Sequence, residues 1–177
     1  MHRPYASLSP DTARHTVTAT STSKAWNVPG LKAAQLILSN DEDAEYWARV
    51  GFLFGHGAST PGVHAATAAY DAGGDWLDGV LRYLDGNRRF LAELLADQLP
   101  QVRWTMPEGT YLAWLDCRGL ALEESAGAFF LDRAGVAMID GPECGAPGAG
   151  HVRLNFATPR PVLATIVERM AAAVAAR

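Results

Sequence analysis

The longest hydrophobic pattern of the chain lies between residues 75 and 99. Its aliphatic residues recur at helical intervals and form one apolar stripe, made of Leu77, Val80, Leu81, Leu84, Leu91, Leu94 and Leu95. Pro100 follows directly and cannot continue a helix. We therefore predict one long amphipathic helix over 75–99.

Before this helix, short apolar segments alternate with helix start signals. They predict, in order, a helix with Ser9 as N-cap and Pro10 in its first turn, a strand within 15–21, a strand buried on both faces over 33–39, a helix capped at Asn40 or Asp41 and running to about Phe52, a loop over 55–62, and a helix from Pro61 to about Asp71. This alternation indicates an α/β part.

After the long helix, the pattern changes. It predicts strands at 102–105 and 110–116 around the turn MPEG, a helix at 122–134, strands at 136–139 and 151–156, and a helix from Pro159 to Arg177 with Val162, Ile166, Met170 and Val174 on one face. This order suggests an α+β unit with helices on one sheet face. We expect Trp104, Tyr111 and Trp114 to pack in its core.

Composition narrows the functional classes. The chain has 177 residues, of which 19% are charged, and its net charge of -4 gives no reason to expect nucleic-acid binding. No apolar run approaches the roughly 20 residues of a membrane span, and the N-terminus lacks a signal-peptide pattern. Cys117 and Cys144 lie far apart, and the histidines show no ligand spacing, so no metal site is expected. We expect a soluble, cytoplasmic protein.

The basic residues point to one short stretch. Thirteen of the fifteen are arginines, and the two lysines, Lys24 and Lys32, both lie in TSTSKAWNVPGLK. An amine can lose its proton and attack a carbonyl, whereas a guanidinium cannot. The hydroxyls of residues 21–23 suit phosphate oxygens, so the stretch fits pyridoxal phosphate (PLP), an aldehyde that carries a phosphate. The alternative is that both are ordinary surface lysines.

A family resemblance adds to this interpretation. The motif S-x-S-K followed by N-x-P-G-L-K resembles the cofactor-lysine motif of fold-type I PLP enzymes, the class I/II aminotransferase superfamily. SKAWNVPGLK is most similar to the branch of cystathionine β-lyase-like enzymes of the MalY/PatB type. The segments AAYDAGGDWLDGVLRYLDGNRRF, MPEGTYLAWLDCR and HVRLNFATPR are also similar to family segments, in the family's order. The resemblance covers essentially the whole chain.

The resemblance implies a role for each of several residues. Lys24 would form the Schiff base with PLP and then move the substrate's α-proton as general acid and base. Arg153 would clamp the α-carboxylate of the substrate, a task that suits the planar guanidinium fork. The alternative for Arg153 is a surface cation at a strand end. The implied phosphate contacts are Ser21, Ser23, Lys32 and, from a neighbouring subunit, Ser59 and Thr60.

The resemblance also implies a fold and a reaction. Residues 1–74 would be the C-terminal part of the PLP-binding large domain, 75–99 a connecting helix, and 100–177 an α+β small domain. The expected activity is a PLP-dependent C–S β-lyase acting on cystathionine or cysteine, or an aminotransferase, in a homodimer.

The resemblance is to the C-terminal half of such an enzyme only. The family places a carboxylate against the pyridine nitrogen from a strand before the lysine, but only 23 residues precede Lys24, and Asp11 falls at a helix start. We therefore expect the apolar faces of 33–39 to be uncovered and a missing N-terminal half to be needed. The alternative function is a catalytically inert fragment, or half of a split enzyme, that acts as a folded or interaction domain. The glycine-rich GAPGAG at 145–150 favours a structural loop over a dinucleotide site.

Overall fold

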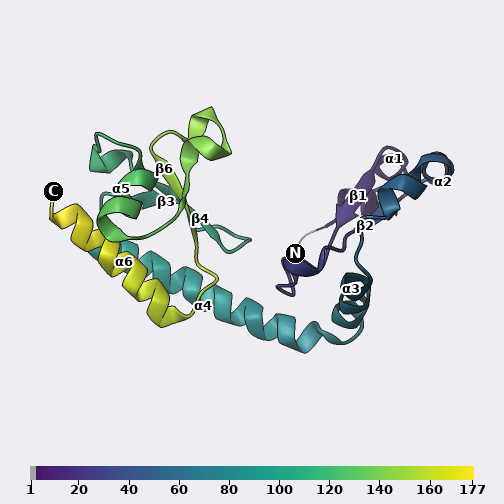
Figure 1. Ribbon diagram of the computed structural model, residues 1–177, viewed down its shortest axis with the longest axis horizontal. Helices are drawn as coiled ribbons and strands as arrows, with labels where there is room; N and C mark the ends of the chain where they lie inside the picture. Colours follow the sequence, from purple (N-terminus) through teal and green to yellow (C-terminus); the bar gives the residue numbers. More distant parts are fainter. Residues whose placement is uncertain (1–2) are drawn as a thin grey trace. The chain divides into compact units, whose positions relative to one another are not determined.

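The boundary between the two units of the protein lies inside its longest helix, α4, which spans Gly74–Gln98 (Figure 1). The computed structural model describes residues 3–177, and the units divide after Gly79. Helix α4 confirms the amphipathic helix predicted over 75–99. The division into domains at residues 74 and 99 stays a prediction.

The first unit is built from short elements that follow local sequence signals. They are α1 (Pro10–Arg14), β1 (Val17–Thr20), a 3₁₀ turn (Pro29–Leu31), β2 (Gln35–Leu38), α2 (Asp41–Gly55) and α3 (Thr60–Ala72), preceded by a 3₁₀ turn at Tyr5–Ser7. All the predicted elements of this part are present. The predicted loop over 55–62 is shorter than expected, because α2 extends to Gly55 and α3 already begins at Thr60.

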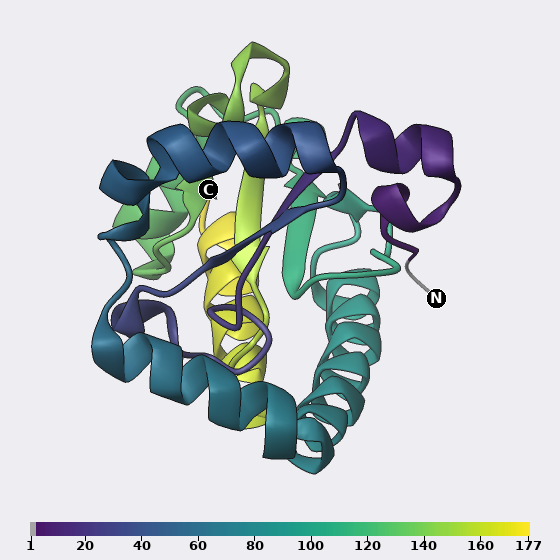
Figure 2. The same ribbon diagram turned by 90° about the vertical axis from the view of Figure 1, so that its right-hand side faces the viewer.

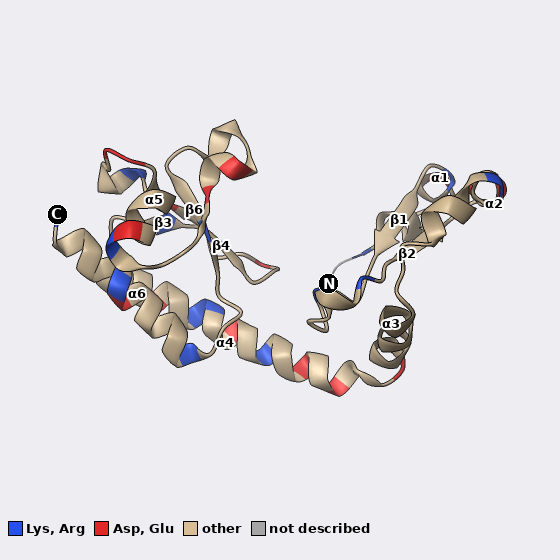
Figure 3. Ribbon diagram, in the orientation of Figure 1, with Lys and Arg blue, Asp and Glu red and all other residues tan. Residues whose placement is uncertain are grey.

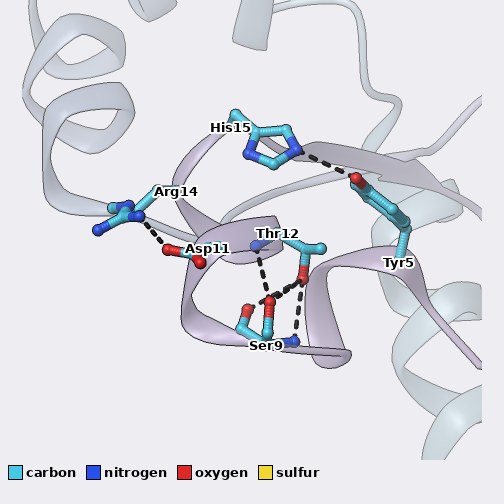
Figure 4. Close-up of polar contacts among 6 residues, drawn as sticks. All are labelled: Tyr5, Ser9, Asp11, Thr12, Arg14 and His15. Atoms are coloured by element: carbon cyan, nitrogen blue, oxygen red, sulfur yellow. Dashed lines mark hydrogen bonds and ion pairs between the residues drawn. The ribbon is translucent and has the colours of Figure 1, made fainter.

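Side-chain caps explain where these helices begin. The Ser9 hydroxyl accepts a hydrogen bond from the Thr12 amide at 3.1 Å, and the Thr12 hydroxyl accepts one from the Ser9 amide at 3.0 Å, which completes a capping box (Figure 4). Asp11 lies in the first turn of α1 and pairs with Arg14. Asn40 caps α2 by accepting from the Asp43 amide at 2.8 Å. Each cap confirms a prediction made from residue type.

The sheet of the first unit has two antiparallel strands, with Val17 opposite Leu38 and Thr20 opposite Gln35. Neither strand carries a charged residue (Figure 3). The prediction that residues 33–39 form a strand buried on both faces is wrong on burial, because Leu36 is 41% and Ile37 is 50% exposed. Within residues 3–177, β1 is the only strand paired with β2. The expectation that these apolar faces stay uncovered is confirmed.

The second unit holds a four-stranded antiparallel sheet in the order β3-β4-β6-β5. Its elements are β3 (Arg103–Trp104), β4 (Leu112–Asp116), a 3₁₀ turn (Arg118–Leu120), α5 (Ala126–Phe129) with a π-helical turn (Phe130–Ala134), β5 (Ile139–Asp140), two 3₁₀ turns (Gly141–Cys144 and Ala146–Gly148), β6 (His151–Asn155) and α6 (Arg160–Ala175). Helices α4 and α6 lie on the same side of this sheet (Figure 1). The α+β prediction for this part is confirmed.

One core lies between that side of the sheet and the helices. Alternate strand residues point into it, as the pleat of a strand requires, and the helices add residues at helical spacing. Its largest members are Leu91, Leu95, Leu99, Leu115, Leu120, Phe130, Val152, Phe156, Leu163, Val167 and Met170, each at most 2% exposed.

Three details of the second unit differ from the prediction. Trp114 does not pack in the core: it is 39% exposed on the outer sheet face, whereas Trp104 and Tyr111 do pack against the core. Of the face predicted for α6, Met170 is buried and Ile166 and Val174 pack against the core, but Val162 is 47% exposed. The fully enclosed positions of α6 also include Leu163 and Val167. The helix predicted at 122–134 begins only after its N-cap Ser125, and β5 shares only Ile139 with the strand predicted at 136–139.

The glycine-rich segment 145–150 has a structural role. A Cβ on Gly148 would lie 2.0 Å from the carbonyl oxygen of Gly141, and a Cβ on Gly141 would lie 1.8 Å from that of Gly148. The two backbone segments can therefore approach this closely only without side chains. This supports the structural interpretation of the loop. Across residues 3–177, no helix combines the length and the apolar character needed to cross a bilayer.

Candidate functional site

Lys24 lies in a tight turn that follows β1 directly. Three backbone hydrogen bonds hold this turn: the Trp26 amide donates to the Thr22 carbonyl at 3.0 Å, the Asn27 amide to the Lys24 carbonyl at 3.4 Å, and the Val28 amide to the Ser23 carbonyl at 3.1 Å. Thr22 is only 2% exposed, while the Lys24 side chain points outward and is exposed. The turn therefore has a buried base that presents the Lys24 amine at the surface of the first unit.

The hydroxyls of Ser21 and Ser23 lie in the same turn as Lys24. Ser21 and Ser23 are half-buried, and the Ser21 hydroxyl accepts a hydrogen bond from the Ser23 amide at 3.4 Å. Accepting this bond leaves the O–H proton of Ser21 free to donate elsewhere. Both serines can therefore offer a donor to an anion next to Lys24. Their role as phosphate contacts stays a prediction.

Lys32 is brought against the start of α3 by Ser59. The Ser59 amide donates to the Lys32 carbonyl at 3.2 Å, and the Ser59 hydroxyl donates to the Leu31 carbonyl. Gly62 makes this approach possible, since a Cβ there would lie 2.2 Å from the Leu31 carbonyl oxygen. The exposed ammonium of Lys32 and the positive end of α3 consequently belong to one local structure, which favours an anion.

Ser59 and Thr60 differ in what they can still donate. The Ser59 hydroxyl accepts from the Gly62 amide at 3.0 Å and has already given its one proton to the Leu31 carbonyl. Thr60, the first residue of α3, is exposed. A phosphate contact through the Ser59 hydroxyl would need a local rearrangement, whereas Thr60 could make one as it stands. Both contacts stay predictions.

Arg153 lies in β6, near the middle of the second unit's sheet. Trp114 and Ile139 are its direct neighbours on the two flanking strands. Val152 and Leu154 point into the core, so Arg153 lies on the opposite, outer face. Among the described residues, no carboxylate forms an ion pair with its guanidinium, which therefore has its fork available for an incoming carboxylate.

Asp116, a carboxylate on the same outer face, is already paired with Arg118. Asp116 accepts two hydrogen bonds from the Arg118 guanidinium, at 2.9 and 2.7 Å, and these hold the pKa of Asp116 well below its usual range. His151 lies opposite Asp116 and stacks on Trp114 at 5.4 Å. Asp116 thus has its own cation and does not compete for Arg153.

The two cysteines differ in exposure and therefore in reactivity. Burial raises the pKa of Cys117 to about 12, with the Asp116 charge as a smaller cause, so this thiol is inert at neutral pH. Cys144 is exposed, and its Sγ lies 4.0 Å from Nη1 of Arg153. Cys144 therefore borders the proposed carboxylate clamp. Within residues 3–177, no cluster of side chains could hold a metal ion.

The site residues predicted from the sequence therefore form two groups. Lys24, Lys32 and their hydroxyl neighbours belong to the first unit, and Arg153 belongs to the second. Sequence reasoning missed two neighbours of these groups. Trp26 anchors the lysine turn, and Trp114 flanks Arg153. Strand alternation could have revealed Trp114, because it is two residues from the polar Asp116 on the same strand.

Comparison with known proteins identifies the family of this chain. The family model for aminotransferase class I and II matches residues 2–170, so the chain belongs to this family. A Mycobacterium tuberculosis relative is 47% identical over 167 residues, which cover 85% of this chain and 41% of the relative.

Two further relatives are named as a cystathionine beta-lyase and a C–S lyase, which supports the MalY/PatB-type branch of the family. The cystathionine beta-lyase of Corynebacterium glutamicum is 36% identical over 166 residues, which cover 94% of this chain and 44% of that enzyme. The solved PLP-bound C–S lyase of Staphylococcus hominis superposes with a TM-score of 0.82 at 33% identity and covers 92% of this chain. The chain covers 44% of that structure, so it spans less than half the length of these relatives.

Proposed function

We propose that this chain carries the lysine and arginine parts of a PLP-dependent C–S β-lyase that acts on cystathionine or cysteine. Membership of the class I and II aminotransferase family, together with the similarity to cystathionine beta-lyases, carries the proposal. The residues fit the cofactor: Lys24 is an exposed amine with two serines beside it, and Lys32 lies against the start of α3.

The chain's own residues would divide the work. Lys24 would hold the cofactor's aldehyde and later move the proton at the substrate's Cα as general acid and base. Ser21, Ser23 and Lys32 would hold the phosphate, and Arg153 would orient the substrate through its carboxylate. When bound, PLP supplies an electron sink that stabilises the carbanion left at Cα. Loss of a thiolate from Cβ would then release a thiol, and hydrolysis of the remainder by water would give pyruvate and ammonia, while transamination is the competing outcome. We propose a homodimer, in which Ser59 and Thr60 face the partner's site.

Labelling tests the central assignment. The full chain is incubated with PLP, treated with borohydride and digested, and the reduced adduct is located by mass spectrometry. We expect the adduct on Lys24 and a matching absorbance band. Lys24→Arg keeps the positive charge but cannot condense with an aldehyde, so it should abolish both signals. Lys32→Arg is the matched control and should keep the adduct. An adduct elsewhere, or none, would contradict the assignment.

The exposed sheet favours a second candidate function. An isolated two-stranded sheet is marginal in water, yet β2 leaves Leu36 and Ile37 on opposite faces, both largely exposed. We propose, as this second candidate, that the chain works as half of a split enzyme and that the exposed faces of β2 bind the polypeptide that carries the other part of the fold.

Complementation separates the two candidates. The remainder of the fold is supplied as a separate polypeptide, and PLP binding and pyruvate release from cystathionine are measured for each part and for the mixture. The split-enzyme candidate predicts both signals in the mixture only. Turnover by this chain alone would exclude it. Replacing Ile37 with Asp should weaken the association, whereas the same change at exposed Val162, on the second unit, should not.

A further inference from the structure

The turn that carries Lys24 is fastened to a distant part of the first unit by one side chain. Trp26, two residues after Lys24, donates a hydrogen bond from its indole Nε1 to the Gly73 carbonyl at 3.0 Å. Its ring also meets Tyr70 edge to face, with centroids 5.4 Å apart and an interplanar angle of 75°. Trp26 therefore contacts the end of α3 through both its polar atom and its aromatic surface.

The fit at Gly73 is close and specific for glycine. Gly73 has φ -85° and ψ 7°, which are angles that any residue can adopt. Backbone conformation therefore does not explain the missing side chain. A Cβ at this position would lie 2.3 Å from the indole Nε1 of Trp26. The space that Gly73 leaves open is thus occupied by the Trp26 ring.

A second connection ties the same helix to the start of the turn. The Tyr70 hydroxyl donates to the side-chain oxygen of Gln35 at 3.4 Å, and Gln35 pairs across the sheet with Thr20, the last residue of β1. The turn begins directly after Thr20. It is consequently held by α3 on both sides of Lys24, at Thr20 through Gln35 and at Trp26 through Gly73.

We infer that Trp26 is a positioning residue for Lys24: it ties the lysine turn to the junction of α3 and α4 and so fixes the direction in which the amine points. The chain changes direction at this junction, between Gly73 and Gly74 (Figure 2). The role of Lys24 itself rests on the proposed function. Trp26 touches neither substrate nor cofactor in this assignment and acts only through the turn.

Variants of Trp26 separate positioning from simple packing. Trp26→Phe keeps an aromatic ring against Tyr70 but removes the N–H donor, and Trp26→Ala removes both. The measurement is the ratio of borohydride-trapped PLP adduct on Lys24 to that on Lys32, well below the melting temperature. We expect the ratio to fall roughly fivefold in Trp26→Phe, as the loss of one hydrogen bond predicts, and further in Trp26→Ala. Trp76→Phe, at a residue that is 50% exposed, is the control and should leave it unchanged.

The outcomes distinguish this inference from the proposed function. A Lys24 adduct whose ratio stays at the wild-type value in Trp26→Phe overturns the inference, because a purely structural residue would not change the ratio among folded molecules. If wild-type Lys24 forms no adduct, the proposed function fails instead. Hydrogen exchange of the Val28 amide, which closes the turn, then decides: about fivefold faster exchange in Trp26→Phe than in Trp76→Phe supports positioning, and equal exchange overturns it.

Discussion

A fully buried amide on α4 gives the sharpest test of how the second unit is held together. Asn87 is 0% exposed, and its Nδ2 donates to the carbonyls of Phe156 at 3.0 Å and Thr158 at 2.8 Å. Its Oδ1 accepts from Nε of Arg160 at 3.3 Å. One side chain thereby ties α4 to the segment between β6 and α6, immediately after the strand that carries Arg153.

Truncation of Asn87 to alanine should strongly lower the free energy of unfolding. Asn87→Ala removes the donor from two backbone carbonyls, and each polar group left without a partner in the interior costs about 1–3 kcal/mol. The free energy of unfolding should therefore fall by about 2–5 kcal/mol, and the melting temperature should drop by on the order of 10 °C or more. Asn87→Asp should cost more at neutral pH, because a carboxylate would then face both carbonyl oxygens.

Urea unfolding followed by circular dichroism measures this loss, and hydrogen exchange of the β4 and β6 amides assigns it to the second unit. Glu93→Ala, on the exposed face of the same helix, is the matched control and should change the free energy by no more than about 0.5 kcal/mol. A loss below about 1 kcal/mol for Asn87→Ala, with an unchanged m-value, would refute the reasoning. It would mean that water or the backbone takes over the two carbonyls.

Three further predictions concern the thiols, acid stability and the first unit. In the native protein a thiol reagent should label Cys144 quickly and Cys117 only after unfolding, and Cys144→Ser should remove the fast phase. Since the folded pKa of Asp116 is lowered, its contribution to stability is present at neutral pH and lost as the pH falls below about 4; Arg118→Ala should weaken this pH dependence of the urea midpoint. Backbone amides of β1 and β2 should exchange at least about tenfold faster than those of β4 and β6, and equal protection would contradict the burial pattern.

Local chemistry explains what the sequence predicted correctly. Ser9 and Asn40 mark helix starts because their side chains replace missing partners of the first amides, and this depends only on residues three positions away. The long helix α4 follows from its apolar stripe for the same reason. The motif around Lys24 identified the family, which the family match over residues 2–170 confirms.

The errors have equally physical causes. The stripe predicted for α6 repeats every four residues, from Val162 to Val174, and such a row drifts by about 40° per step around a helix of 3.6 residues per turn. The true face, which starts at Leu163, mixes steps of three and four and stays aligned with the core. In β4, residue size suggested that Trp114 is buried, but the pleat places the smaller Ala113 inside.

Contacts between segments that are distant in the chain could not be predicted from the sequence. The bond from the Trp26 indole to the Gly73 carbonyl joins segments that no local rule connects, and so does the bond from the Ser59 hydroxyl to the Leu31 carbonyl. Both contacts require a glycine at one point of close approach, Gly73 in the first case and Gly62 in the second. A lone glycine in a helical pattern has many explanations, so neither could be assigned in advance.

The two units differ in how many buried residues stabilise them, and this affects how firmly each can hold its predicted site residues. Of the buried hydrophobic residues, Ala66 alone belongs to the first unit among residues 3–177, and all the others belong to the second. The second unit therefore has its own core and can present Arg153 on a stable sheet. The first unit carries Lys24 on a turn held by hydrogen bonds and one aromatic contact, beside a strand whose two faces are open. Covering these faces would stabilise the turn that carries Lys24, so under the proposed function the binding of a partner at these faces and the placement of the Lys24 amine should be thermodynamically linked.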